Sequence, residues 1–172
     1  VETSENLTVD MGVPIGEAAL GAIASTVINI DDDDSSLGFE IAATTNSENT
    51  GVVNVVVTRT GNVNSQVRVG YQMADGTARA GEDYVSQPGE LTFNAGVTSQ
   101  TIPVTLLNDQ FVEGQEQFSI VLVFVTLGQA NVNPAAMTFN MVIDDDDSSI
   151  RFTQSTISSV ERNTNVLISV ER

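Results

Sequence analysis

The sequence predicts an all-β protein, an immunoglobulin-like antiparallel β-sandwich of about seven strands arranged in tandem repeats. Three observations predict this fold. Valine, threonine and glycine are frequent, and this composition favours strands and turns over helices. Short β-branched segments alternate with turn residues along the chain. The sequence also repeats itself, with a run of four aspartates at each junction.

The expected strands follow one another in the middle of the chain. The segments VVNVVVTR, TIPVTLL and FSIVLVFV have the length and β-branched content of buried strands, and TGNVNS and SQPGE supply turns. The segment GEAALGAIA has weak helical character, but glycines interrupt it. The Cys–Trp–Cys core of antibody domains is absent. The expected strands are Leu37–Ala43, Val52–Arg59, Gln66–Met73, Glu90–Phe93, Gln100–Leu107, Gln117–Val125 and Ala136–Ile143.

Two alignments define the repeat. INIDDDDSSLGF aligns with MVIDDDDSSIRF, so that Asp31 corresponds to Asp144, 113 positions later. VETSENLTVDM aligns with VEGQEQFSIVL, so that Val1 corresponds to Val112, 111 positions later. We therefore expect the C-terminal part of one repeat (residues 1–34), a complete repeat (35–146) and the N-terminal part of a third (147–172). Because partial repeats leave strand edges unpaired, we expect either a window on a longer polymer or ends that complete themselves against neighbouring chains.

Composition excludes several classes of function. The net charge is −17, from 23 acidic residues and six arginines, so nucleic acids and anionic membranes are improbable partners. No apolar run approaches the ~20 residues of a membrane-spanning helix, so we expect no direct membrane insertion. The chain has no cysteine and no histidine, which excludes disulfides, thiolate metal sites and the usual nucleophilic triads. We do not expect an enzyme.

Three motifs occur in order within the middle repeat: DGTARAGEDYVSQPGELTF (Asp75 to Phe93), IPVTLLNDQFVEGQEQFSIVL (Ile102 to Leu122) and the closing VIDDDD. With these motifs the repeat resembles a Calx-β domain. The resemblance implies a β-sandwich of the kind found in the regulatory loop of sodium/calcium exchangers. Such domains also form tandem arrays in large extracellular adhesion and matrix proteins. Some members bind several calcium ions at one end of the sandwich.

The resemblance also implies a set of calcium ligands, carried over by position. Asn108 departs from the pattern, since calcium-binding members often have aspartate there, and one charge is lost. Asp147 lies past the family's terminal aspartates, and we expect it to face solvent. The implied ligands of the middle repeat are Glu48, Asp83, Asn108, Asp109, Glu113, Asp144, Asp145 and Asp146. By the repeat alignment, the flanking fragments would add Glu2, Asp31, Asp32, Asp33 and Glu161.

Elementary chemistry also favours calcium. Ca²⁺ takes 6–8 oxygen ligands, and no single loop here has the EF-hand spacing, so ligands must come from several loops. Adjacent aspartates repel one another, and a divalent cation removes that cost. An alternative is that the aspartate runs are only solvated linkers, but their repetition in one register, together with Glu48, Asp83 and Glu113, favours calcium. The DGTARAG segment lacks the lysine and following helix of a phosphate loop and is interpreted as a turn.

The leading functional hypothesis is a calcium-binding, adhesive or structural segment of an extracellular or cell-surface Calx-β array. Its partners would be neighbouring repeats of the same or identical chains, and other cell-surface or matrix proteins. Only two serines separate the last aspartate from the next strand, which is too few for a free hinge, so calcium would stiffen the junctions of a rod or filament. The alternative is a calcium-sensing regulatory domain of a membrane transporter. A third, weaker hypothesis is a matrix protein whose aspartates nucleate calcium mineral.

Overall fold

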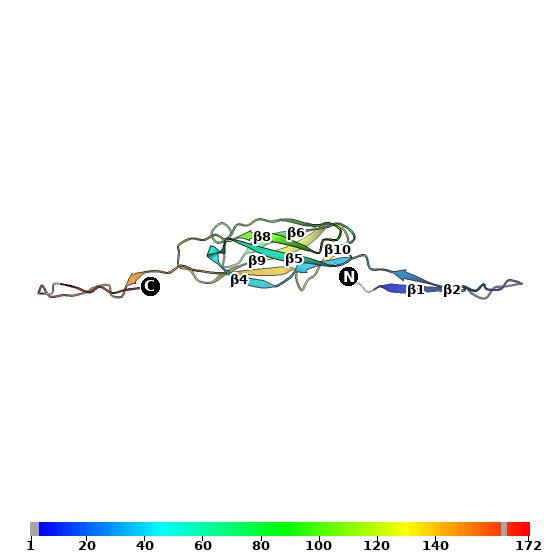
Figure 1. The fold of residues 1–172 in the computed structure, drawn as a ribbon, viewed down its shortest axis with the longest axis horizontal. Coiled ribbons are helices and arrows are strands. Elements are labelled where there is room, and N and C mark those ends of the chain that lie inside the picture. Colours follow the sequence, from blue (N-terminus) through cyan, green and yellow to red (C-terminus); the bar gives the residue numbers. More distant parts are fainter. Residues whose placement is uncertain (1–3, 163–164) are drawn as a thin grey trace.

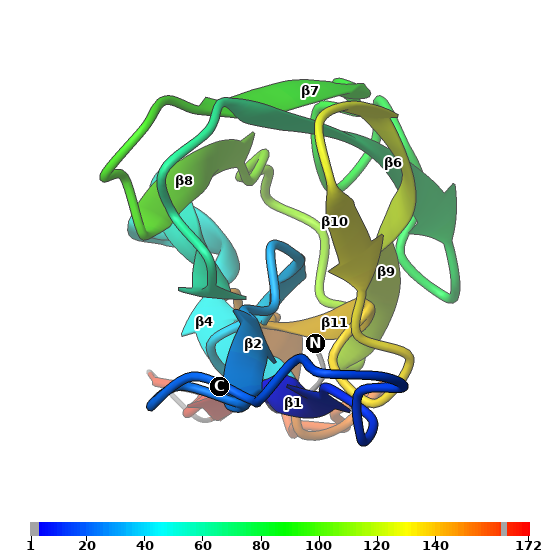
Figure 2. The same ribbon diagram turned by 90° about the vertical axis from the view of Figure 1, so that its right-hand side faces the viewer.

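The computed structural model describes residues 4–162 and 165–172, and two β-sheets packed face to face occupy the middle of the chain (Figure 1). One sheet has the strand order β10–β3–β5–β8, and the other has the order β4–β11–β9–β6–β7. Seen along the long axis, the strands surround a common interior (Figure 2). The predicted β-sandwich is confirmed. The strands are β3 (Ser35–Phe39), β4 (Ala43–Ser47), β5 (Val52–Gly61), β6 (Val67–Asp75), β7 (Gly89–Phe93), β8 (Ser99–Thr105), β9 (Glu116–Leu127), β10 (Ala130–Val132) and β11 (Thr138–Asp144).

The segment Leu37–Ala43, which was expected to form one strand, contributes to two different strands. β3 ends at Phe39, and β4 begins at Ala43 in the opposite sheet, after a bend. The chain thus crosses between sheets, and β4 runs parallel to β11. The strand β10 lies outside the expected strands because three residues are too few to give a strand pattern, and it runs parallel to β3. The other pairs in the two sheets are antiparallel among the described residues.

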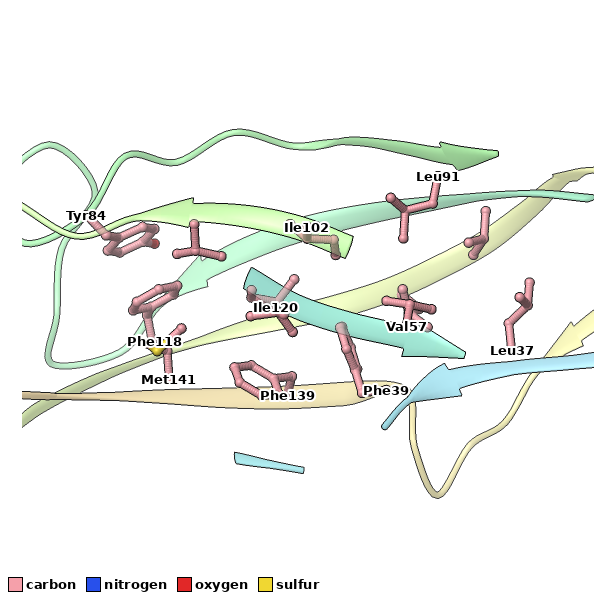
Figure 3. Close-up of a cluster of buried hydrophobic side chains, with 14 of the residues drawn as sticks. Leu37, Phe39, Val57, Tyr84, Leu91, Ile102, Phe118, Ile120, Phe139 and Met141 are labelled. Atoms are coloured by element: carbon pink, nitrogen blue, oxygen red, sulfur yellow. The ribbon is translucent and has the colours of Figure 1, made fainter. Parts of the chain in front are cut away.

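The core lies between the sheets and follows the two-residue period of the strands (Figure 3). Along β9, Phe118, Ile120 and Leu122 are buried, and the residues between them are more exposed. Tyr84 stacks on Phe118 with ring centroids 3.7 Å apart. Complete burial of each large apolar side chain contributes roughly 1.5–3 kcal/mol. The sandwich is therefore held together mainly by apolar side chains from both sheets.

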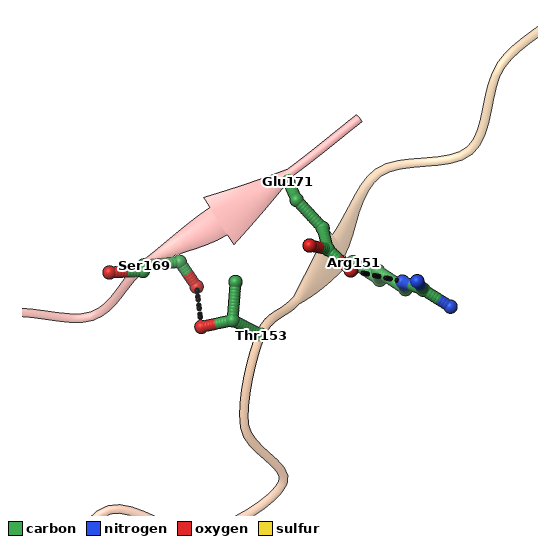
Figure 4. A network of polar contacts seen from close by, with 4 residues as sticks. All are labelled: Arg151, Thr153, Ser169 and Glu171. Atoms are coloured by element: carbon green, nitrogen blue, oxygen red, sulfur yellow. Dashed lines mark hydrogen bonds and ion pairs between the residues drawn. The ribbon is translucent and has the colours of Figure 1, made fainter.

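Two arms extend from opposite ends of the sandwich (Figure 1). The N-terminal arm is the hairpin of β1 (Glu5–Asp10) and β2 (Ser25–Ile30), in which every strand residue is exposed. The C-terminal arm pairs β12 (Arg151–Phe152) with β13 (Val170–Glu171). In that arm Arg151 Nε donates to Glu171 Oε1 at 2.6 Å, and Thr153 Oγ1 donates to the Ser169 carbonyl at 3.3 Å (Figure 4). The described residues include no helix long and apolar enough to cross a bilayer.

Candidate metal centre

Acidic side chains from several segments meet at the end of the sandwich nearer the C-terminal arm. The parallel pairing of β4 with β11 and the antiparallel pairing of the other strands place four strand termini at this edge: the end of β4, the end of β8, the start of β9 and the end of β11. A 3₁₀ turn, η1 (Glu48–Thr50), follows β4 there. Gly51 ends this turn with a φ of 78°, a backbone conformation that favours glycine, and so allows the chain to enter β5.

The first cluster consists of Glu48, Asp109 and Asp147. One carboxylate oxygen of each lies within 4.8 Å of the other two. The Glu48 side chain is 5% exposed, and the Asp109 backbone N–H donates to its Oε1 at 3.4 Å. These residues come from η1, from the β8–β9 connection and from the segment after β11, so only the tertiary fold brings them together.

The second cluster consists of Asp83, Glu113 and Glu116, again with carboxylate oxygens within 4.8 Å of one another. Asp83 lies in the turn between β6 and β7, where the Arg79 backbone N–H donates to its Oδ2 at 2.6 Å. Glu116 is the first residue of β9 and is in phase with the buried Phe118. The period of two therefore places Glu116 on the core-facing side, at the end of the strand.

The aspartate run alternates between two environments. Asp145 and Asp147 are partly buried, and Asp144 and Asp146 are exposed, which continues the alternation of β11 beyond the end of that strand. Asp145 Oδ2 accepts from the Glu113 backbone N–H at 2.8 Å, and its Oδ1 accepts from the Asp147 backbone N–H at 2.9 Å. Asp145 thus ties the β8–β9 connection to the terminal aspartates.

At this end of the sandwich, four carboxyl groups have raised pKa values, because their surroundings disfavour the charged form. Burial, followed by the negative charges of Asp109 and Asp145, raises the pKa of Glu48. Burial and a hydrogen bond with Asp83 raise the pKa of Glu116 to about 7. Burial followed by neighbouring carboxylates also raises the pKa values of Glu113 and Asp147. The cost of holding these charges together would be offset by a bound cation.

The donors fit a hard divalent cation. Asp147 Oδ2 is buried and has no hydrogen-bond partner among the described residues. Such an atom is costly unless something positive approaches it. The side-chain ligands of the two clusters are carboxylate oxygens, which suit Ca²⁺ better than zinc or copper, since those metals prefer imidazole and thiolate ligands. Glu48, Asp109 and Asp147 would hold one ion, and Asp83, Glu113 and Glu116 another.

The predicted ligands of the middle repeat fall into two groups. The structure brings Glu48, Asp83, Asp109 and Glu113 into the clusters, and Asp145 contacts Glu113 and Asp147. The other three are exposed: Asn108 donates its side-chain amide to the Asp109 carbonyl, Asp144 accepts from Gln115, and Asp146 accepts from Asn49. The ligand roles of all eight residues stay predictions.

The predicted ligands of the flanking fragments lie elsewhere. Asp31, Asp32 and Asp33 precede β3 at the opposite end of the sandwich, where Gln129 donates to Asp33 Oδ2 at 3.4 Å. Glu161 is exposed in the C-terminal arm. Glu2 lies outside the described residues. The ligand roles of these residues also stay predictions.

The structure corrects one expectation and adds one residue. Asp147 does not face solvent, because the alternation begun in β11 turns it inward with Asp145. The sequence reasoning also missed Glu116, which lies with Asp83 and Glu113 in the second cluster. In both cases the signal was in the sequence. Glu116 is two positions from the core residue Phe118 of β9, and Asp147 is four positions beyond the core residue Ile143 of β11.

Comparison with known proteins gives the family. Residues 31–147 match the Calx-beta domain, and the chain belongs to the Calx-beta domain family. It is 35% identical over 131 residues to the sodium/calcium exchanger Calx of Drosophila melanogaster, and this match covers 76% of this chain and 14% of the exchanger. It is 32% identical over 132 residues to the human extracellular matrix organizing protein FRAS1, and this match covers 70% of this chain and 3% of that protein.

A solved structure has the same fold. The calcium binding domain CBD12 of CALX1.1 superimposes with a TM-score of 0.61 and 33% sequence identity, covering 79% of this chain and 57% of that chain. The chain thus spans only a small share of the exchanger and matrix relatives, although it matches a large part of the solved domain structure.

Proposed function

We propose that the Calx-beta domain of this chain, residues 31–147, binds calcium at the end of the sandwich that holds the two acidic clusters. The observation that carries the proposal is the buried Asp147 Oδ2, which has no hydrogen-bond partner among the described residues and lies beside Glu48 and Asp109. The similarity to a structure whose title names a calcium binding domain supports it. A bound cation would supply positive charge to these carboxylates.

We further propose that the domain senses calcium and regulates the larger protein of which it is part, as a transporter's regulatory domain would. The similarity to a sodium/calcium exchanger supports this role over the structural one. Without a cation, Glu48, Asp109 and Asp147 repel one another, which favours separation of the β8–β9 connection from the segment after β11. With that repulsion neutralised, Asp109 and Asp147 hold the two segments together. Since the second segment leads into the C-terminal arm, the chain beyond the domain would respond to calcium.

A second candidate is a structural role in an extracellular array, as in the leading hypothesis from sequence. The similarity to FRAS1 favours it, and so does the short junction of Ser148 and Ser149 between the aspartate run and Ile150. In that role calcium would stiffen the junction and would not carry a signal. The carboxylates of the same two clusters would act as ligands in both roles.

The test of binding is a calcium titration of the full chain, followed by calorimetry and by thermal unfolding. Ligand that binds the native state alone stabilises it by about 2.7 kcal/mol at one hundred times Kd, so Tm should rise in calcium relative to chelator. Magnesium should raise it less, because it requires near-octahedral geometry and keeps its waters. Identical unfolding curves in chelator and in millimolar calcium would refute calcium binding.

The affinity distinguishes the two candidate roles. Cytosolic calcium sensors have Kd values of roughly 10⁻⁷–10⁻⁵ M, whereas extracellular modules have values of roughly 10⁻⁴–10⁻³ M. We expect a Kd in the first range. A Kd in the second range would support the structural role in an extracellular array and contradict the sensing role.

A further inference from the structure

The N-terminal hairpin reproduces the pairing of two strands of the sandwich. In the repeat alignment, β1 corresponds to β9 at 111 positions and β2 corresponds to β11 at 113 positions. The hairpin pairs Glu5 with Ile30, and the sandwich pairs Glu116 with Ile143, which are the aligned residues. The strand register therefore agrees with the sequence alignment, and the hairpin is a copy of the β9–β11 pair.

The copied positions are apolar but uncovered. Along β9 the core residues Phe118, Ile120 and Leu122 are at most 2% exposed. At the aligned positions, the N-terminal arm has Leu7, Val9 and Met11, which are 54%, 46% and 56% exposed. Val9 and Met11, with Ile23 and Ala24, also line an apolar hollow on this arm. The arm thus presents the core-facing side of a β9–β11 pair to solvent.

The C-terminal arm reproduces another strand pair in the same way. It pairs Phe152 with Val170, and the sandwich pairs Phe39 with Val57, the residues 113 positions earlier. Phe39 and Val57 are buried, whereas Phe152 is 66% and Val170 is 54% exposed. The C-terminal arm is therefore a copy of the β3–β5 pair with its core-facing side uncovered.

These two strand pairs bind one another in the complete domain. The β3–β5 pair lies in one sheet and the β9–β11 pair in the other, and Phe39 contacts Phe139 across them with ring centroids 5.6 Å apart. β4, which directly follows β3, pairs with β11 through five residues of each strand. The two arms of the chain thus carry surfaces that are complementary in the domain itself.

We propose that the N-terminal arm of one copy of this chain binds the C-terminal arm of a second copy, in the arrangement that joins β9–β11 to β3–β5. Because the arms extend from opposite ends of the sandwich, one copy cannot make this contact with itself (Figure 1). The contact is head-to-tail, and repeated contacts of this kind give an open linear assembly. Among the described residues, the two arms contain no counterparts of β6, β7 and β8, so for this chain we expect reversible association that grows with protein concentration.

A disulfide experiment tests the predicted register, since the chain has no cysteine. Asn140 of β11 pairs with Ala43 of β4, and their aligned residues are Val27 and Thr156. Neighbouring strands are about 4.8 Å apart, within the Cα separation that a disulfide spans. The double variant Val27→Cys/Thr156→Cys, oxidised at high salt with chelator, should give a ladder of linked chains. High salt screens the repulsion between the acidic chains, so this test does not depend on calcium binding.

The matched control is Val13→Cys/Thr156→Cys. Val13 is 89% exposed, so random collision would link it at least as readily, but it lies outside the paired hairpin. We expect several-fold more linked chains from the Val27 variant than from this control. Equal yields from both variants would overturn the proposal.

Sedimentation of the unmodified chain gives a second measurement. Its average mass should rise with concentration, and Leu7→Asp should reduce that rise more than Val13→Asp, since Leu7 aligns with the core residue Phe118. Both variants add the same charge, so the comparison isolates the aligned apolar position. A chain that remains monomeric at all concentrations, or a rise that both variants reduce equally, would also overturn the proposal.

Discussion

Replacing Glu48 by glutamine should have opposite effects on the domain without calcium and with it. Glu48 is buried beside Asp109 and Asp147, and burial followed by neighbouring negative charge raises its pKa. Glutamine has nearly the same shape, and its Oε1 can still accept from the Asp109 backbone N–H. The substitution therefore removes a buried charge and leaves the packing intact. We expect a more stable calcium-free domain that binds calcium more weakly.

The magnitude follows from the separation of the carboxylates. Oxygens of Glu48 and Asp109 lie within 4.8 Å of each other. At that distance two unit charges repel by about 1 kcal/mol in bulk water and by about 3.5 kcal/mol at an effective dielectric constant of 20. Because Asp109 is partly exposed, we expect a gain of roughly 1–3 kcal/mol, which corresponds to a Tm increase of about 4–10 °C for a domain of this size. Loss of one carboxylate ligand should weaken calcium binding by at least about tenfold, or ~1.4 kcal/mol.

The assay is thermal unfolding of the wild type and Glu48→Gln, each in chelator and in saturating calcium. The matched control is Glu40→Gln, which makes the same chemical change at an exposed position outside both clusters. We expect the control to match the wild type under both conditions. If Glu48→Gln lowered Tm in chelator, or if it retained the full stabilisation by calcium, the reasoning about repulsion and coordination would be refuted.

Three further predictions concern the site and the core. The pKa of Glu116 is raised to about 7 in the folded domain, so the folded state binds this proton more tightly than the unfolded chain does. Tm in chelator should therefore fall as the pH rises from about 5 to 8. A Tm that stays constant or rises over this pH range would contradict the prediction. By calorimetry, Asp145→Ala and Asp147→Ala should each weaken calcium binding more than Asp144→Ala, whereas equal losses would indicate a diffuse effect of charge. Phe118→Ala should cost about 3–5 kcal/mol in urea unfolding, and a loss below ~1 kcal/mol would contradict its place in the core.

Local pattern predicted most of the fold. The segments that became β5, β8 and β9 have the length and the β-branched content of buried strands, and this local composition was enough to predict them. The bend between Phe39 and Ala43 could not be predicted in this way. The residues on both sides of the bend have strand propensity. The chain crosses to the other sheet because β3 pairs with β5, whereas β4 pairs with β11.

The sequence alone also determined the chemistry of the site. Carboxylates without histidine or cysteine restrict the donors to oxygen, and the repeated aspartates mark where those donors concentrate. Which carboxylates meet was decided by the tertiary structure, because Glu48 and Asp147 are 99 positions apart in the chain. Adjacent residues of an extended chain point in opposite directions, so four consecutive aspartates cannot all face one ion. The phase of β11 against the core turned Asp145 and Asp147 inward and left Asp144 and Asp146 in solvent.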